Sequence, residues 1–476
     1  MRQARQLKLG IAPTRRVIFS IEEAARQKCS IEQKLTSMGV EFVNIDGVND
    51  EGLVFDRTHV APALEIFRRE KVDALFIPHV NFGTEDAIAR LARDLGKPVL
   101  LWGPRDDAPL PDGSRVGDTQ CGLFATSKIL RRMGAPFSYI VNSRIEDAVF
   151  ERGLRNFLGA AAAVRALRGA RIGQVSTRPT AFWTMMVNEG ELLERWGVEV
   201  VPIALGDLLL AAGKIIDAAG PRLAAEVEGI RRGFETRGAD DASLGKLAAL
   251  KLALTDWVEH NALDAVALQC WSALQDAFGI FPCFVHGLLT DEGVPVTCET
   301  DIHGALGALM LQEATGRASA VFFADLTIRH PSDDNAELLW HCGPFPASLA
   351  AEGCPKRLSG HYIHPQQPLG VGEWELRGGP ITLVRFDGDN GRYQLFLGHA
   401  RGTTGPFTRG TYLWAKVGNW PLWEERLIRG PYVHHVAGVH GHVAPMLYEA
   451  CRFLGIEPDC VEPDEREIQA WLRGEG

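Results

Sequence analysis

The sequence contains no C-x-x-C pair among its nine cysteines, which are odd in number and widely scattered. A chain of 476 residues can bury sizeable hydrophobic cores, so it does not need disulfide bonds for stability. We therefore expect reduced thiols, as in a cytoplasmic protein. The basic start, MRQARQLKLGIAPTRR, is followed by no apolar signal segment, and this also predicts a cytoplasmic location.

Long hydrophobic runs and basic blocks are missing as well. The most apolar stretch, VPIALGDLLLAAG, is interrupted by Asp207 well short of the ~18 residues that a membrane span needs. The net charge of −10, from 50 Lys and Arg against 60 Asp and Glu, is spread over the whole chain. The sequence therefore predicts no membrane segment and no nucleic-acid partner, and it favours a small, neutral molecule as the ligand.

Several common catalytic motifs are also absent. No G-x-G-x-x-G follows the first strand-like run, and the chain has no H-E-x-x-H and no G-x-S-x-G. The Gly-Lys of GADDASLGKL is followed by Leu247, where a phosphate-binding loop needs Ser or Thr. These absences disfavour nicotinamide, ATP, zinc-protease and serine-hydrolase chemistry.

The first two thirds of the chain contain a regular alternation of strand-like and helix-like segments. Short apolar runs such as LKLGIA, ALFIPH and PVLLWG are separated by helical patterns such as TEDAIARLARDLG. This alternation predicts a parallel sheet covered by helices on both faces. Because the pattern begins again at ARIGQVST, we expect two doubly wound α/β domains, over residues 1–168 and 169–318.

Strand-like runs dominate from about residue 320, among them AVFFADL, ELLWHCG and RYQLFLGHA. The segment DGDNG, between ITLVRF and RYQLFL, is typical of a β-hairpin turn. Residues 319–476 are therefore predicted to form a β-rich C-terminal domain with one late helix, APMLYEACRFLG.

Carboxylates end two of the apolar strands, and a histidine lies in a third apolar run. Glu299 ends VPVTCE before a helix opened by Asp301, Asp325 ends AVFFAD, and His435 lies in VHHVAGVHGHV. Since α/β sheets bind ligands at the carboxyl ends of their strands, the three would form an O/O/N site for Mn²⁺ or Mg²⁺, with the imidazole favouring Mn²⁺. The alternative is that the carboxylates cap helices or turns, for which Asp301 is the best candidate, and that the histidine belongs to the core.

At these residues the sequence resembles the L-fucose/L-arabinose isomerase superfamily, and most closely the shorter L-fucose isomerase-like proteins. The resemblance runs nearly end to end, and its most specific parts are CETDIHGAL, LLWHCG and the late HHVAGVHGH. It implies two α/β domains and a β-rich C-terminal domain, assembled into homo-oligomers, commonly hexamers. It also implies interconversion of aldoses and ketoses with Mn²⁺ held by a Glu, an Asp and a His.

By motif, the resemblance assigns these metal ligands to Glu299, Asp325 and His435. Glu299 and Asp325 would also carry the proton between C1 and C2, while the ion stabilises the ene-diolate. His435, preferred to His434 for its spacing to the following Gly-His, would be a ligand only. The chain is shorter than the fucose isomerases proper, which predicts that substrate loops are missing or rebuilt.

Three candidate substrate contacts lie near this predicted centre. Gln269 and Trp271 flank Cys270 at a strand end and would contact sugar hydroxyls, and His341 in LLWHCG would face the site. The alternative for His341 is a core histidine bonded to the backbone.

Two further candidates lie elsewhere in the chain. Trp420 in GNWPLW would stack on a sugar ring, although core packing is the commoner role of a tryptophan. Arg16, beside Arg15 after the first strand, would reach the site of a neighbouring subunit, as early residues do in this family. A surface position is the alternative for both arginines.

The sequence therefore predicts a Mn²⁺-dependent aldose–ketose isomerase that acts through an ene-diol. A second hypothesis keeps the metal-dependent enolate chemistry but applies it to a modified sugar or sugar acid, by isomerisation or carbon–carbon cleavage. A third hypothesis is a sugar-binding protein without turnover, because paired α/β lobes also suit ligand capture. The three aligned metal-ligand types argue against binding alone.

Overall fold

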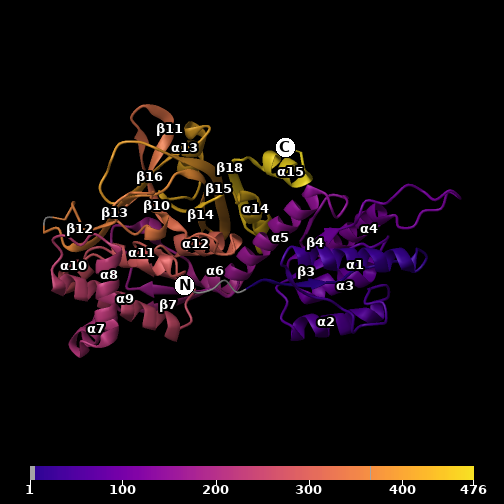
Figure 1. Ribbon diagram of the computed structural model, residues 1–476, viewed down its shortest axis with the longest axis horizontal. Coiled ribbons are helices and arrows are strands. Elements are labelled where there is room, and N and C mark those ends of the chain that lie inside the picture. The colour runs from indigo at the N-terminus through magenta and orange to yellow at the C-terminus, as the bar shows by residue number, and fades with distance from the viewer. Residues whose placement is uncertain (1–5, 365, 476) are drawn as a thin grey trace. The chain divides into compact units, whose positions relative to one another are not determined.

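The computed structural model describes residues 6–364 and 366–475, which form two compact units (Figure 1). Unit 1 contains Ala166–Ala444 and Ile456–Asp464. Unit 2 contains the described part of Arg5–Arg165, Pro445–Gly455 and the described part of Glu465–Gly476. The division into domains at residues 1–168, 169–318 and 319–476 stays a prediction of the sequence.

Unit 2 is built on a five-stranded parallel sheet with the order β2-β1-β3-β4-β5. Its strands are β1 (Lys8–Ile11), β2 (Glu41–Val43), β3 (Ala74–Pro78), β4 (Val99–Trp102) and β5 (Phe137–Tyr139). Its helices are η1 (Arg57–His59), α1 (Ile21–Ser37), α2 (Val60–Arg69), α3 (Glu85–Leu95), α4 (Thr119–Arg132), α5 (Ala148–Leu167), α14 (Ala444–Leu454) and α15 (Glu465–Arg473). Every residue of β3 and β4 is buried, as expected for a parallel sheet with both faces covered.

Unit 1 begins with a second parallel sheet, which has the order β7-β6-β8-β9. Its strands are β6 (Arg171–Val175), β7 (Glu199–Ile203), β8 (Ala265–Leu268) and β9 (Val296–Thr297). The helices around it are η2 (Trp183–Met185), α6 (Glu189–Trp196), α7 (Leu205–Ala218), α8 (Pro221–Gly233), α9 (Asp241–His260), α10 (Ala273–Phe278), α11 (Cys283–Asp291) and α12 (Ile302–Ala314).

The rest of unit 1 is a nine-stranded, mainly antiparallel sheet, drawn mostly in orange in Figure 1. Its strands are β10 (Phe322–His330), β11 (Asp333–His341), β12 (Arg357–Gly360), β13 (Leu369–Glu375), β14 (Gly379–Asp389), β15 (Arg392–Thr403), β16 (Thr411–Lys416), β17 (His435–His440) and β18 (Glu457–Glu462). It also carries η3 (Ala347–Leu349) and α13 (Trp420–Arg429). An additional pairing of β15 with β16 closes six strands, β10, β11, β16, β15, β14 and β17, into a barrel.

Local sequence explains the longest hairpin of this barrel. Strands β14 and β15 pair in unbroken antiparallel register from Gly379↔Gly402 to Asp389↔Arg392. The turn residues between them, Asn390 and Gly391, have φ of 48° and 75°. These are the two residue types that favour the left-handed turn of a tight hairpin. The hairpin predicted at DGDNG is confirmed.

Helix α12 joins the two halves of unit 1. All its residues are buried, which explains why it is apolar all round rather than amphipathic. One side of α12 contacts β6, β8 and β9 of the parallel sheet, and the other contacts β14 and β17 of the barrel. The hydrophobic core of unit 1 is accordingly continuous, from Val175 at the end of β6 to Val461 in β18.

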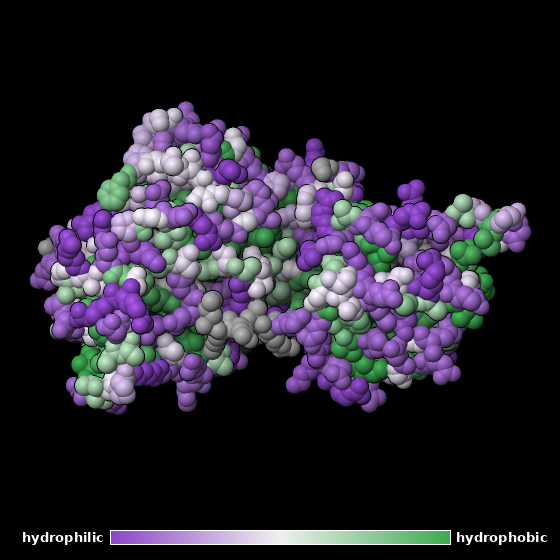
Figure 2. Space-filling view, viewed as in Figure 1, coloured by the Kyte–Doolittle hydropathy of each residue, from purple (hydrophilic) through white to green (hydrophobic). Residues whose placement is uncertain are grey.

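The predicted fold class is confirmed, since two parallel-sheet α/β regions are followed by a β-rich region that contains a barrel. Hydrophilic side chains cover much of the face of the molecule shown in Figure 2, with hydrophobic ones scattered between them. Among the helices that the structure describes, none has the length and hydropathy to cross a membrane.

Candidate metal and active site

The turn from β9 into α12 places two acidic side chains side by side. Glu299 and Thr300 have φ of 53° and 63°, a left-handed conformation that is uncommon for residues other than glycine. Such backbone strain is typical of functional sites. Asp301 then caps α12, because its Oδ1 accepts a hydrogen bond from the Gly304 N–H at 2.8 Å. The capping role predicted for Asp301 is confirmed.

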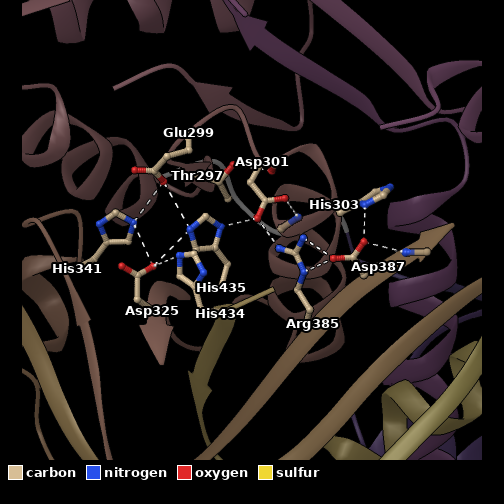
Figure 3. Close-up of polar contacts among 12 residues, drawn as sticks. Thr297, Glu299, Asp301, His303, Asp325, His341, Arg385, Asp387, His434 and His435 are labelled. Carbon is tan, nitrogen blue, oxygen red and sulfur yellow. Dashed lines mark hydrogen bonds and ion pairs between the residues drawn. The ribbon is translucent and has the colours of Figure 1, made fainter. Parts of the chain in front are cut away.

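The barrel brings three further side chains to the same point. Asp325 on β10 lies opposite His435 on β17, and His341 ends the neighbouring strand β11. The His435 Nε2 atom lies 3.4 Å from Asp325 Oδ1 and 3.6 Å from Glu299 Oε2 (Figure 3). The His341 Nε2 atom lies 3.7 Å from Glu299 Oε2 and 3.8 Å from Asp325 Oδ1. Two carboxylates and two imidazoles, which we call the acidic centre, therefore face one another.

The donor atoms of the acidic centre fit a divalent ion. Glu299 Oε2, Asp325 Oδ1 and His341 Nε2 are buried atoms with no hydrogen-bond partner among the described residues. Two ligands on one ion with bonds of about 2.1 Å lie roughly 3.0–3.5 Å apart, close to the separations seen here. The nitrogen and oxygen donors are of the type that Mn²⁺ and related divalent ions accept.

The neighbouring His434 is less well placed than His435. Its Nε2 atom lies 3.9 Å from Asp325 Oδ1, and its side chain is 53% exposed against 2% for His435. In the described residues, His434 has ion-pair geometry with Asp325 alone, whereas His435 has it with Asp325 and Glu299 together.

Burial and opposite charges shift the pKa values of the acidic centre. Burial raises the pKa of Glu299, but His341 and His435 outweigh burial and bring the pKa down to about 2. Burial lowers the pKa of His341, but Asp325 and Glu299 outweigh it and raise the pKa to about 9. At neutral pH the Glu299 carboxylate is therefore ionised, and the negative charge of the carboxylates favours a cation at the centre.

A buried chain of ion pairs supports His435 from behind (Figure 3). Its Nδ1 atom lies 2.8 Å from Asp301 Oδ2, and Arg385 on β14 pairs with the same carboxylate. Arg385 Nη2 lies 2.6 Å from Asp387 Oδ2, and Asp387 Oδ1 lies 3.0 Å from His303 Nδ1. Because an ionised carboxylate only accepts hydrogen bonds, the Nδ1 of His435 donates to Asp301, and its Nε2 faces the acidic centre.

No pattern in the sequence predicts this supporting chain of ion pairs. Arg385 and Asp387 lie on a barrel strand more than 80 residues after Asp301, with no local pattern that links them to it. Burial raises the pKa of Asp301, but Arg385 and His435 outweigh burial and hold the pKa well below its usual range. Asp301 therefore remains an anion although it is buried.

The segment after β8 also approaches the acidic centre. Cys270 donates its thiol to Glu299 Oε1 at 3.1 Å, which places the flanking Gln269 and Trp271 nearby. Trp271 is half-buried and packs edge-on against Phe281 and His361, with ring centroids 5.4 and 4.9 Å apart. Contact of Gln269 and Trp271 with a sugar stays a prediction.

The structure does not bring Trp420 to the acidic centre. Its side chain is 5% exposed, lies in the hydrophobic core and stacks on Trp423. Its backbone N–H donates to Asn335 at the beginning of β11, six residues and about 20 Å from His341 at the other end. Core packing, the alternative weighed for Trp420, describes its position.

Arg16 lies in unit 2, at the carboxyl end of β1. Its guanidinium stacks over Phe82 at 4.0 Å and pairs with Glu85 at 2.9 Å. The neighbouring Arg15 is 4% exposed and pairs with Glu51 at 2.6 Å. A contact of Arg16 with the site of a neighbouring subunit stays a prediction.

A pocket that the sequence analysis missed opens next to the turn that carries Glu299 and Asp301. It has a volume of about 650 Å³, and Thr300 and Ile302 line it together with the loop after β6, including Thr177, Arg178 and Trp183. The Thr300 hydroxyl donates to the Thr177 carbonyl oxygen at 3.2 Å, which ties this loop to the turn.

Comparisons with known proteins agree with this architecture. Residues 10–168 match the family described as fucose/sulfoquinovose isomerase, N-terminal domain. The chain is 27% identical over 400 residues to a sulfoquinovose isomerase of Priestia aryabhattai, covering 83% of this chain and 86% of that protein. It is 28% identical over 327 residues to a sulfoquinovose isomerase of Alkalicoccus urumqiensis, covering 68% and 71%.

Among solved structures, a periplasmic solute binding protein with bound D-allose from Actinobacillus succinogenes 130z matches 66% of this chain and 93% of its own, at 12% identity. Its TM-score is 0.17, which is too low to indicate a shared fold. The family match and the curated relatives agree with the resemblance stated from the sequence. The chain is similar to the fucose/sulfoquinovose isomerase family over residues 10–168 and to curated sulfoquinovose isomerases over most of its length.

Proposed function

We propose that this protein is a divalent-metal-dependent aldose–ketose isomerase that acts on a sugar through an ene-diol. The observation that carries the proposal is the acidic centre, where buried carboxylate oxygens without hydrogen-bond partners face imidazole nitrogens at 3.4–3.8 Å. The sulfoquinovose isomerases that cover most of this chain support the same reaction class. Mn²⁺ is the ion proposed, bound by Glu299, Asp325 and His435.

When bound, the ion would polarise the oxygens of the substrate at C1 and C2 and stabilise the negative charge of the ene-diolate. The protein supplies the proton transfer. Glu299 is ionised at neutral pH and is held in place from Oε1 by Cys270, so its Oε2 can accept the proton from carbon. Asp325 stands across the centre. After Glu299 releases its proton to solvent, Asp325 can take up a proton from solvent and give it to the neighbouring carbon. His341 is placed to donate a hydrogen bond to a substrate oxygen.

The pocket beside Thr300 favours a sugar that carries an anionic group. Arg178 lines this pocket, and within the described residues it donates hydrogen bonds to the carbonyl oxygens of Pro179 and Thr180 and to no carboxylate. A guanidinium that has no carboxylate partner can pair with a sulfonate or a phosphate. We therefore infer that a sulfosugar such as sulfoquinovose is the preferred substrate class, in agreement with the names of the relatives.

The test is a screen of metal-stripped protein reloaded with Mn²⁺, Mg²⁺ or Co²⁺ against sulfoquinovose, L-fucose, L-arabinose and glucose. Products are identified by NMR in D₂O. We expect turnover that depends on the added ion, is fastest for the sulfosugar, and places deuterium at C2. Equal activity before and after reloading would contradict metal dependence, and binding of sugars without turnover would favour the non-catalytic hypothesis.

We also propose that the protein forms a homo-oligomer, in which Arg16 of one subunit approaches the acidic centre of another. The loop that follows Arg16 supports this, because Val17 and Ile18 are 61% and 79% exposed and Ile21 is 49% exposed. Neighbouring exposed apolar side chains of this kind are typical of protein–protein contacts.

A further inference from the structure

Four buried cysteines lie in the segments that surround the Glu299 carboxylate. They come from the loops after β8, β9 and β11 and from the first turn of α11, and they are Cys270, Cys298, Cys342 and Cys283. The Sγ atoms of Cys270 and Cys298 and a carboxylate oxygen of Glu299 all lie within 4.8 Å of one another.

The two oxygens of Glu299 face two chemically different sets of donors. Oε1 accepts the Cys270 thiol at 3.1 Å, whereas Oε2 lies 3.6 and 3.7 Å from His435 and His341. Donors on the Oε2 side are oxygen and nitrogen atoms, which suit hard or borderline ions. Donors on the Oε1 side are sulfur atoms, which suit thiophilic ions.

We propose that Cys270, Cys298 and Glu299 form a second metal site, which binds a thiophilic d¹⁰ ion such as Zn²⁺ or Cd²⁺. In a tetrahedral zinc site, a sulfur at 2.3 Å and an oxygen at 2.0 Å from the ion lie about 3.5 Å apart, close to the separation of Cys270 from Glu299. The fourth position falls to water.

A buried histidine supports the sulfur side of this site. His286 on α11 is fully buried, and its Nδ1 atom lies 3.4 Å from Cys298 Sγ. Groups that contact metal ligands in this way orient them and tune their affinity. Binding is written as Zn²⁺ + 2 R–SH → Zn(S–R)₂ + 2 H⁺, with the carboxylate already ionised, so no oxidant or reductant takes part.

If the protein is the isomerase proposed above, sharing one carboxylate between two metal sites affects its turnover. An ion held by the thiols withdraws Oε1 and part of the negative charge of Glu299 from the acidic centre. Zn²⁺ or Cd²⁺ should therefore inhibit turnover even when Mn²⁺ is saturating. A thiol chelator, rather than more Mn²⁺, should restore activity.

The test is titration of the metal-free full-length protein with Cd²⁺, followed by the ultraviolet absorption of cadmium–thiolate bonds. To remove thiols that bind metal adventitiously, the protein carries Cys29→Ser and Cys121→Ser, since both side chains are exposed. We expect one strong site and release of about two protons per ion. X-ray absorption of the Zn²⁺ form should show about two sulfur ligands at 2.3 Å.

Variants assign the ion to these residues. Cys270→Ser and Cys298→Ser should each weaken Cd²⁺ binding at least about 10-fold, whereas Cys451→Ser, a buried thiol of unit 2, should leave it unchanged. His435→Ala should keep the cadmium–thiolate band, because it alters the acidic centre alone. A band unaffected by the Cys270 and Cys298 variants, or a metal-free protein that shows no such band, would overturn the proposal. If the serine variants do not fold, the sulfur count of the Zn²⁺ form decides.

Discussion

Asp301 uses its two oxygens for two different purposes. Oδ1 caps α12 through the Gly304 N–H, and Oδ2 holds the Nδ1 of His435 at 2.8 Å and pairs with Arg385. An aspartate at a helix N-terminus is ordinarily explained by capping alone. Here the cap also fixes the tautomer of a proposed metal ligand, so the beginning of α12 and the acidic centre are built from the same side chain.

Replacing Asp301 by Asn should separate these two purposes. An asparagine still caps the helix through its amide oxygen. Because the amide is neutral, it cannot replace the anionic oxygen that accepts from the Nδ1–H of His435 and pairs with Arg385. We expect Mn²⁺ affinity of the apo protein to fall about 10–100-fold, measured by electron paramagnetic resonance of free Mn²⁺. Asp240→Asn, which keeps the cap of α9, is the matched control and should leave the affinity unchanged. Unaltered binding in Asp301→Asn would mean that this contact does not tune the ligand.

Replacing Glu299 by Gln should keep the fold but remove nearly all turnover. An amide has almost the same shape as the carboxylate, but it cannot accept a proton and coordinates metal more weakly. Proton transfer contributes typically ~10²–10⁴ to a rate, so kcat should fall by at least 100-fold at saturating Mn²⁺. The measurement is deuterium incorporation at C2 in D₂O, with wild type and variant compared side by side. Full activity in the variant would remove Glu299 from the chemistry.

At the scale of residues, sequence reasoning finds titratable side chains that border apolar runs and misses those that support them, although Asp325 lies inside β10 rather than at its end as predicted. Glu299 and Asp325 stand out because each follows an apolar run, and His435 stands out because it lies within one. Arg385 lies inside a barrel strand, where its side chain is 1% exposed. Its role becomes visible only when the structure places it beside Asp301. Cys270, one residue from two predicted substrate contacts, points at Glu299 for reasons that only the packing of β8 against β9 shows.

At the scale of elements, close packing between barrel strands depends on glycines. Gly438 on β17 lies opposite Phe322 on β10, in the same strand pair that holds His435 against Asp325. A Cβ at Gly438 would meet the Phe322 ring at 2.2–2.7 Å, which side-chain rotation cannot relieve without moving the core around it.

Gly438→Ala should therefore destabilise unit 1, by about 1–3 kcal/mol as is typical of an overpacked core. The measurement is the thermal unfolding midpoint followed by near-ultraviolet circular dichroism. Gly213→Ala is the control, because Gly213 lies in α7 with no atom within 4 Å of its added Cβ, and a helical Ala is favoured over Gly by up to about 1 kcal/mol. An equal or higher midpoint in Gly438→Ala would contradict the tight contact between β10 and β17.

The elements themselves are largely readable from the sequence. Fully buried strands such as β3, β4 and β8 give continuous apolar runs, and the β14–β15 hairpin has its turn residues where the pattern requires them. The closure of six strands into a barrel is not readable. It depends on one pairing, between β15 and β16, whose residues come together across a loop with no distinctive pattern.

At the scale of the whole molecule, the lowered pKa of the Glu299 carboxyl group predicts how the stability of the fold depends on pH. The pKa of Glu299 falls from 4.5 to about 2 on folding, so the folded state favours its ionised form. A carboxyl group whose pKa is lower in the folded state stabilises the fold at pH values above its pKa in the unfolded state. This stabilisation is lost as pH falls toward the pKa of the folded state, here between about pH 5 and pH 2. By linkage, this contribution is about 3 kcal/mol at most.

We therefore expect the thermal midpoint of the metal-free protein to fall as pH is lowered from 5 toward 3. The difference between wild type and Glu299→Gln isolates the carboxylate, because the amide does not titrate. It should be largest at pH 6–7 and shrink as pH falls. A difference that is constant with pH would show that Glu299 adds no linked stability.

The assembly of whole molecules is tested by the exposed apolar loop after β1. Ile18 is 79% exposed. In the proposed oligomer, a second copy of the chain would bury this apolar side chain. Ile18→Asp should dissociate the oligomer, because it places a charge where apolar surface is buried. Light scattering on a size-exclusion column measures the mass. Ile428→Asp is the control, since Ile428 on α13 of unit 1 is 75% exposed and should leave the mass unchanged. A wild-type mass near 52.2 kDa at micromolar concentration would contradict the oligomer and remove the proposed role of Arg16.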